Sequence, residues 1–128
     1  MDFYLSPNGR VSLGQYWLRF MLPFIAIYAV VVFVAFATMG VESMANIDTS
    51  NPMAVYTTGP GMVIALVGLV LLWPSIAVSI KRLHDIGWTG WLVLLSLVPI
   101  ASFVILVVNW FIPGNSGDNK YGPDPRNR

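Results

Sequence analysis

Three long stretches of the chain contain no charged side chain, and this feature restricts the fold more than any other. The stretches are Phe20 to Val41, Met62 to Ile80 and Trp91 to Ile112. About 20 helical residues cross a bilayer core of about 30 Å, and a helix satisfies its own backbone hydrogen bonds there. The sequence therefore predicts an all-α membrane protein with three transmembrane helices.

The composition agrees with this class. Hydrophobic residues make up 56% of the chain and charged residues 10%, whereas about one quarter of the residues in a soluble domain are charged. The net charge of +1 comes from 7 basic and 6 acidic side chains, too few to form a basic face for nucleic acid. We expect the lipid bilayer as a partner, no nucleic acid, and a single transmembrane domain over residues 1–128.

Turn and capping residues mark where the first helix begins. Pro7 to Gly9 is typical of a turn, and Ser12 with Gln15 forms a candidate capping box. The apolar run that follows exceeds the 7 to 15 residues, roughly, of a signal-peptide core, so we expect it to remain as a span. The expected elements are a short amphipathic lead-in, helix 1 over about 13–40, an external loop over 42–60, helix 2 over about 61–85, helix 3 over about 89–112 and an irregular tail over 113–128.

Basic residues predict how these helices are oriented. Lys81 and Arg82 follow the second span directly, while the loop from Glu42 to Pro60 has no Lys or Arg. Because cytoplasmic loops carry an excess of Lys and Arg, we expect the amino terminus in the cytoplasm and the first loop outside. Three full spans would then place the carboxyl tail outside.

The carboxyl tail leaves a second topology open. Its basic residues Lys120, Arg126 and Arg128 would lie on the unfavoured side after three full spans. If the third run is re-entrant and broken at Pro99, all seven basic residues lie inside. Protein must then cover the exposed backbone of that segment, because lipid offers it no hydrogen bonds. The simple span is the first expectation and the re-entrant segment its alternative.

Small side chains form a stripe along helix 2. Their spacing alternates between four and three residues, which places them on one helix face. Lipid gives helices no hydrophobic drive to associate, so small residues that admit close approach are a common sign of a helix contact. We expect helix 2 to be the central helix; the alternative is that small residues recur there by chance. The stripe consists of Gly61, Ala65, Gly68, Leu72, Ser75 and Ser79.

The densest group of functional side chains lies at the end of helix 2, from Lys81 to Asp85. His84 and Asp85 are types that serve as an acid and base pair. Sequence neighbours do not face one another on a helix, however. We therefore favour a membrane-surface anchor in which Asp85 pairs with Arg82 and Gly87 ends the helix in a left-handed cap. The candidate functional cluster is Arg82, His84 and Asp85. With one His and no Cys in the chain, we predict no metal site, no cofactor and no catalytic residue.

Three segments that together extend over nearly the whole chain carry a recognisable pattern. They are Gly9-Arg10-Val11-Ser12 through Tyr16-Trp17, then Lys81-Arg82-Leu83-His84-Asp85-Ile86-Gly87 with Gly90-Trp91, then Pro113-Gly114 through Asn119-Lys120-Tyr121-Gly122-Pro123-Asp124-Pro125. Together they resemble the bacterial inner-membrane family named domain of unknown function 805. The resemblance implies a small helical inner-membrane protein and no particular activity. The chain differs from the family pattern at Leu13 and Gly14, where further basic residues are common, and its loop over 42–60 is long.

We expect a non-enzymatic inner-membrane component that associates through helix 2 with a second copy or a larger membrane-protein partner. One alternative is a transport path lined in an oligomer by Ser75, Ser79, Ser102 and Asn109, although no span has an ionisable interior residue. Another is lipid-headgroup binding or processing at the Lys81 to Asp85 cluster.

Overall fold

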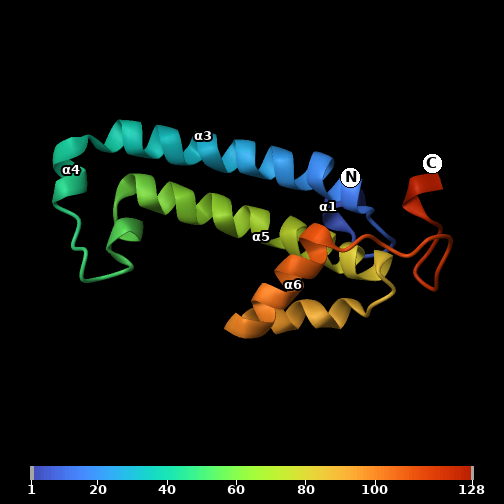
Figure 1. The fold of residues 1–128 in the computed structure, drawn as a ribbon. Helices are drawn as coiled ribbons and strands as arrows, with labels where there is room; N and C mark the ends of the chain where they lie inside the picture. The colour runs from blue at the N-terminus through green and yellow to red at the C-terminus, as the bar shows by residue number, and fades with distance from the viewer. Residues whose placement is uncertain (1, 128) are drawn as a thin grey trace. The chain divides into compact units, whose positions relative to one another are not determined.

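A computed structural model describes residues 2–127, without the side chains of residues 44 and 127, and these residues form helices and no strand (Figure 1). Two helices are long and apolar enough to cross a membrane, Leu13–Met39 and Gly59–Asp85. The first is continuous over α2 (Leu13–Gln15), the π-helical segment η1 (Tyr16–Met21) and α3 (Leu22–Met39), and the second is α5 (Gly59–Asp85). The short elements are α1 (Asp2–Leu5), α4 (Val41–Ala45), η2 (Ala54–Thr57) and η4 (Pro125–Asn127).

The predicted capping box at the start of the first helix is confirmed. Ser12 Oγ accepts a hydrogen bond from the backbone N–H of Gln15 at 3.3 Å, and Gln15 Oε1 accepts one from the N–H of Ser12 at 3.2 Å. Two of the free N–H groups at the helix start are thereby satisfied. The local sequence alone fixes where this helix begins.

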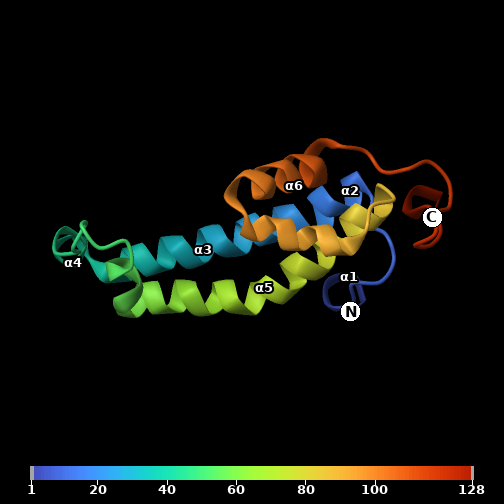
Figure 2. The same ribbon diagram turned by 90° about the horizontal axis from the view of Figure 1, so that it is seen from below.

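The chain divides into two compact units. The helix-pair unit is Pro23–Leu72, and the hairpin unit comprises the chain up to Leu22 and from Trp73 onward. Within the helix-pair unit, α3 and the first part of α5 run antiparallel beside each other (Figure 2). A Cβ added at Gly68 would lie 3.2 Å from the Tyr28 hydroxyl. Gly68 thus serves a helix contact inside the chain.

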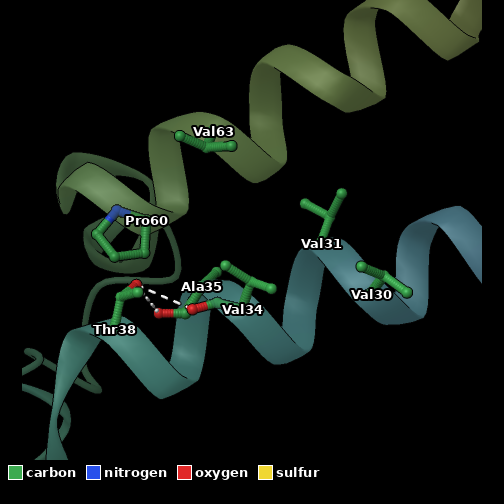
Figure 3. Close-up of a pocket in the computed structure, with 7 residues that line it drawn as sticks. All are labelled: Val30, Val31, Val34, Ala35, Thr38, Pro60 and Val63. Carbon is green, nitrogen blue, oxygen red and sulfur yellow. Dashed lines mark hydrogen bonds between the residues drawn. The ribbon is translucent and has the colours of Figure 1, made fainter.

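A groove of about 560 Å³ lies along the helix-pair unit (Figure 3). Its one side-chain hydroxyl, on Thr38, donates to the carbonyls of Val34 and Ala35 at 2.9 and 3.0 Å. The groove is therefore an apolar surface suited to lipid chains or to another helix. Its lining residues are Val30, Val31, Val34, Ala35, Thr38, Pro60 and Val63.

The third apolar run is two segments, where a single helix over about 89–112 was expected. It consists of the 3₁₀ helix η3 (Gly90–Leu97) and the α-helix α6 (Pro99–Phe111), and Val98 between them is extended with φ −98° and ψ 122°. Proline disfavours a helical conformation in the preceding residue and has no N–H to continue a helix, so the chain reverses at Pro99. Neither segment reaches membrane-spanning length, and three full spans are not confirmed.

The two segments form a helical hairpin within the hairpin unit (Figure 2). Arg82, near the end of α5, donates from Nε to the carbonyl of Asn109 at 3.2 Å and from its guanidinium to the carbonyl of Ile112. The end of α6 therefore returns to the end of α5 from which the hairpin departs.

Candidate functional site

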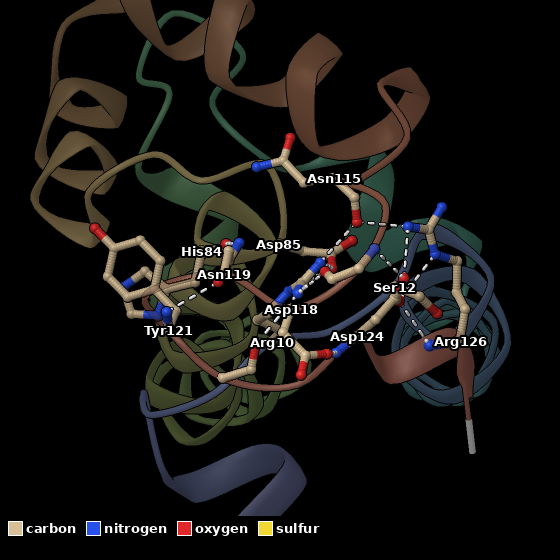
Figure 4. A network of polar contacts seen from close by, with 12 residues as sticks. Arg10, Ser12, His84, Asp85, Asn115, Asp118, Asn119, Tyr121, Asp124 and Arg126 are labelled. Atoms are coloured by element: carbon tan, nitrogen blue, oxygen red, sulfur yellow. Dashed lines mark hydrogen bonds and ion pairs between the residues drawn. The ribbon is translucent and has the colours of Figure 1, made fainter.

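A buried ion-pair cluster of Arg10, Arg82 and Asp85 lies at the end of α5. Figure 4 shows Arg10 and Asp85 of this cluster. Arg10 Nη2 is 3.0 Å from Asp85 Oδ1, and Arg82 Nη1 is 3.2 Å from Asp85 Oδ2. All three side chains have 0% exposure. The predicted pairing of Asp85 with Arg82 is present, and Arg10 is a second partner 75 residues away.

The remaining donors of Arg10 bind the carboxyl tail. Its guanidinium donates to the carbonyls of Asn115 at 2.8 Å, Gly117 at 2.7 Å and Gly122 at 3.3 Å. Arginine offers five N–H donors in a planar fork, so one side chain can hold a carboxylate and several carbonyls together. Arg10 therefore joins the start of the chain, the end of α5 and the tail.

The backbone of the tail closes over Asp85. The N–H of Asn115 donates to the carbonyl of Asp85 at 2.8 Å. A Cβ at Gly114 would lie 1.8 Å from Asp85 Oδ2, a distance that only glycine avoids. The absence of a side chain at Gly114 lets the tail cover the carboxylate.

The predicted left-handed cap at Gly87 is confirmed. Gly87 has φ +84°, its N–H donates to the carbonyl of His84 at 3.0 Å, and Trp88 N–H donates to that of Leu83 at 2.9 Å. These are the two bonds of a Schellman motif. A Cβ at Gly87 would also lie 2.5 Å from Asn115 Nδ2, so the tail packs on the same turn.

His84 points away from Asp85 and binds different groups. Its Nδ1 lies 3.1 Å from the carbonyl of Gly9, and its ring stacks on Tyr121 with centroids 3.9 Å apart and planes at 5°. Asn119 Nδ2 donates to the carbonyl of His84 at 2.9 Å. Because the carbonyl of Gly9 can only accept a hydrogen bond, its contact with the His84 ring assigns the ring proton to Nδ1. His84 and Asp85 do not form an acid and base pair in this geometry.

Lys81 holds the amino-terminal segment. Its ammonium donates to the carbonyls of Asp2 and, at 2.9 Å, of Phe3, and its own carbonyl accepts from the N–H of Val11 at 3.3 Å. The ammonium also lies 5.6 Å from the centroid of the Phe3 ring. The basic pair Lys81 and Arg82 is therefore bound within the protein, with Lys81 5% exposed and Arg82 fully buried.

The tail itself is held by Asp124. Arg126 Nη2 lies 3.0 Å from Asp124 Oδ2, which also accepts from the N–H of Gly117 at 2.9 Å. The hydrogen bonds from Arg126 hold the pKa of the Asp124 carboxyl well below its usual range. Asp118 Oδ1 accepts from the N–H of Asp124 at 3.0 Å. The oxygen side chains of the tail thus serve turns and ion pairs of the tail.

A crevice of about 420 Å³ opens beside the hairpin. Ser79, Ser102 and Asn109 line it, three of the four polar residues that the sequence singled out within the spans. Asn109 is 3% exposed, and its Oδ1 has no hydrogen-bond partner among residues 2–127. The full lining is Tyr16, Ser79, Ser96, Pro99, Ser102, Phe103, Ile105, Leu106, Asn109 and Trp110.

The stripe of small residues does not lie at one site. Gly61 lies in the first turn of α5 and packs against the segment before the helix, because a Cβ there would lie 1.8 Å from the carbonyl oxygen of Val55. Gly68 faces Tyr28, and Ala65 is half-buried in the same unit. Ser75 and Ser79 lie in the hairpin unit. At Gly61 and Gly68 the close approach is to the chain's own residues.

Sequence reasoning missed Arg10 as a member of the ion-pair cluster, and it missed Gly114 and Asn115 as the tail residues that contact the cluster. Their partners are distant in sequence, and no local pattern connects them to Asp85. The only signal was their presence in the segments that carry the family resemblance. Among residues 2–127, no group of three or more His, Cys, Asp or Glu side chains is arranged to hold a metal ion.

These features define a helical membrane protein with two membrane-length helices, a broken third apolar segment and a buried ion-pair cluster at the end of α5. The chain belongs to the family described as protein of unknown function (DUF805), whose sequence model matches residues 4–123.

Two relatives of the chain are inner membrane proteins of Escherichia coli. The chain is 35% identical over 68 residues to the inner membrane protein YhaH of Escherichia coli K12, covering 53% of this chain and 56% of that protein. It is 40% identical over 58 residues to the inner membrane protein YhaI of the same organism, covering 45% and 49%. The chain thus spans about half the length of the curated relatives it matches. No solved structure matches the chain.

Proposed function

We propose that this protein is a non-enzymatic component of the bacterial inner membrane that associates with other membrane helices, either of a second copy or of a partner subunit. The observation that carries the proposal is the burial of the charged cluster. Arg10, Arg82 and Asp85 are fully buried and bonded to one another and to backbone carbonyls. A catalytic or headgroup-binding site needs groups that reach a ligand, and these do not.

The membrane-embedded helices offer the surface for association. In α3, Ala35 is the buried residue, while large apolar side chains such as Phe33 at 73% exposure face outward. Lipid solvates such a face as well as a partner helix does, so shape and polar groups decide whether helices associate. The apolar groove along α3 and α5 supplies shape that a partner helix can fill.

The proposed orientation places both ends of the chain in the cytoplasm. The end of α5, the amino-terminal segment and the tail meet through Arg10, Lys81 and Asp85. These segments carry Arg10, Lys81, Arg82, Lys120 and Arg126, and the positive-inside rule assigns such a basic end to the cytoplasm. The hairpin of η3 and α6 is then re-entrant.

Fluorescence photobleaching of labelled protein at native membrane density tests the association. We expect most particles to bleach in two or more steps. We expect Phe33→Ala to lower the fraction of such particles severalfold. Met53→Ala, an exposed apolar residue of the loop, is the matched control. Gly68→Ile is unsuitable, because Gly68 faces Tyr28 of the same chain. Chemical cross-linking in the membrane tests association with a different protein. Single bleaching steps at every membrane density, together with no cross-link to any membrane protein, would overturn the proposal.

A transport path is the second candidate, and one observation favours it. Ser79, Ser102 and Asn109 line one crevice, as a polar path between copies would require. Flux of neutral solutes across reconstituted vesicles, lost in Asn109→Leu, supports this candidate. Absence of flux over a panel of solutes counts against it.

A further inference from the structure

A pocket of about 490 Å³ lies beside the last turns of α5, on residues that all belong to the hairpin unit. Of the residues from Lys81 to Asp85, His84 alone lines it. The lining contains no acidic residue and no Lys or Arg. The pocket is therefore a different place from the buried ion-pair cluster.

The pocket is polar at one end and apolar along its length. Ile76, Ile80 and His84 line it at intervals of four residues on α5, so they share one helix face. At a rise of about 1.5 Å per residue, this face extends about 12 Å from His84 to Ile76. Asn8 and Thr89 also line the pocket and directly precede residues that contact His84. Because basic residues place the end of α5 at the membrane surface, the apolar part extends from there into the bilayer, as a lipid does.

His84 presents an accessible hydrogen-bond acceptor to this pocket. Since its ring proton lies on Nδ1 and binds the carbonyl of Gly9, Nε2 carries a lone pair. Among residues 2–127, Nε2 has no hydrogen-bond partner, and the only fully buried side-chain nitrogen or oxygen without a partner is Asn109 Oδ1. Nε2 is therefore open to a hydrogen-bond donor of a ligand.

Gly90 keeps the space beside Nε2 free. A Cβ at Gly90 would lie 3.0 Å from His84 Nε2 and 2.6 Å from Cγ2 of Ile80. Any side chain at this position would fill the space next to the acceptor. The pocket thus reaches Nε2 because residue 90 has no side chain.

A cation lies close to the polar end. The Lys120 ammonium is 5.0 Å from the centroid of the Tyr121 ring, and the His84 ring stacks on the same ring at 3.9 Å (Figure 4). The ammonium and the imidazole are therefore separated by no more than the sum of these distances. Lys120 is exposed, and the ion pairs of the described residues do not include it. A ligand bound at His84 can extend an anionic group to Lys120.

These groups distinguish among membrane lipids. The headgroup of phosphatidylcholine has no hydrogen-bond donor for His84 Nε2. Phosphatidylethanolamine has a donor, but its ammonium is repelled by the charge of Lys120. An anionic lipid with a headgroup hydroxyl offers a donor to Nε2 and a phosphate to the ammonium.

We propose that this pocket binds one anionic phospholipid with a hydroxyl-bearing headgroup, such as phosphatidylglycerol. The headgroup hydroxyl donates to His84 Nε2, the phosphate pairs with Lys120, and an acyl chain lies against Ile76 and Ile80. This inference goes beyond the proposed association, because it needs neither a second copy nor a partner protein.

Photo-crosslinking in nanodiscs tests this binding. The full chain carries p-benzoylphenylalanine in place of Leu94, which lines the pocket and is 55% exposed. The nanodiscs are phosphatidylcholine with equal small fractions of phosphatidylethanolamine, phosphatidylglycerol and phosphatidylpropanol, which has the charge of phosphatidylglycerol and no hydroxyl. We expect lipid adducts, identified by mass, to be enriched in phosphatidylglycerol over all three others. The same photoreactive group in place of Val70, a 75% exposed residue of the helix-pair unit, should give adducts in proportion to the membrane composition.

His84→Phe tests the hydroxyl contact. The variant keeps an aromatic ring beside Tyr121 and removes Nε2. We expect the preference for phosphatidylglycerol over phosphatidylpropanol, about fivefold for one hydrogen bond, to disappear. Equal enrichment of these two lipids in the wild-type pocket overturns the proposal, whether or not His84→Phe folds.

Lys120→Gln tests the phosphate contact at an exposed residue, where the fold is expected to persist. We expect adducts of both anionic lipids to fall about fivefold relative to phosphatidylcholine. Arg19→Gln, an exposed cation outside the lining, is the matched control and should keep the wild-type pattern. Unchanged adducts in Lys120→Gln, or enrichment of phosphatidylethanolamine equal to that of phosphatidylglycerol, contradict the proposed site. Lost enrichment with unchanged photobleaching steps separates this site from the association.

Discussion

Gly114 lies directly against the carboxylate of Asp85, so closely that a Cβ at residue 114 would come within 1.8 Å of Asp85 Oδ2. The contact joins the tail to the end of α5 and excludes water from the ion-pair cluster. It also explains why a residue without a side chain follows Pro113. The cluster and the tail are therefore one structural unit.

Substitution of Gly114 tests this contact. Gly114→Ala forces the tail away from Asp85, and overpacking of this kind costs about 1 to 3 kcal/mol. We expect a lower melting temperature in detergent and faster proteolysis of the tail. Gly14→Ala is the control, because a Cβ there meets nothing within 4 Å. Equal stability of Gly114→Ala and wild type would show that the tail does not close over Asp85.

Neutralising Asp85 tests the ion-pair cluster. Asp85→Asn leaves the two buried guanidinium groups of Arg10 and Arg82 without their carboxylate, and breaking a buried pair costs about 3 to 5 kcal/mol. We expect most molecules to unfold at a denaturant concentration at which the wild type is folded. Asp48→Asn, an exposed loop carboxylate, should unfold as the wild type does. If Asp85→Asn lost no more stability to denaturant than the Asp48→Asn control, the structural role of the ion-pair cluster would be contradicted.

The tail pair of Asp124 and Arg126 predicts a defined pH dependence. The pKa of Asp124 lies below its ordinary value of 3.8, so ionised Asp124 stabilises the folded tail. This contribution is complete above the ordinary pKa and is lost as the pH falls from there through the lowered pKa. Proteolysis of the tail should differ between wild type and Asp124→Asn at pH 7, and the difference should shrink only below about pH 4. A difference that disappears between pH 7 and pH 5 would refute this assignment.

Pro99 keeps the third apolar run in two segments. Pro99→Ala removes the restriction on Val98, and a helix from Gly90 to Phe111 becomes long enough to cross the bilayer. With Arg10→Ala added, the tail also loses its hold on the ion-pair cluster. We expect the double variant to move a measurable fraction of tails to the other side, as read by labelling of an introduced cysteine. Unchanged labelling of the double variant would mean that neither residue keeps the tail in place.

Features encoded by neighbouring residues could be predicted from the sequence. Ser12 and Gln15 form the capping box, and Gly87 the left-handed cap, because both depend on residues within one or two turns. The two membrane-length helices follow in the same way from uncharged runs. Family membership was likewise visible in the segments around Arg10, Arg82 and Tyr121.

Features that join distant residues could not be predicted. The contact of Arg10 with Asp85 spans 75 positions, and no periodicity marks either residue as the partner of the other. From the sequence, a break at Pro99 is only the alternative to a full span, because a proline at one position is also compatible with a kinked span. Its consequence depends on where α6 ends, which the bonds from Arg82 to Asn109 and Ile112 determine.

The side of the membrane on which the tail lies tests the proposed re-entrant hairpin most directly. The chain has no cysteine, so Ser116→Cys in the tail and Asn51→Cys in the loop report one site each, and both residues are exposed. A maleimide that does not cross membranes is applied to intact spheroplasts and then to permeabilised ones. A re-entrant hairpin predicts that Asn51→Cys is labelled from outside and that Ser116→Cys is labelled only after permeabilisation. Labelling of both from outside would mean that the third apolar run crosses the membrane completely.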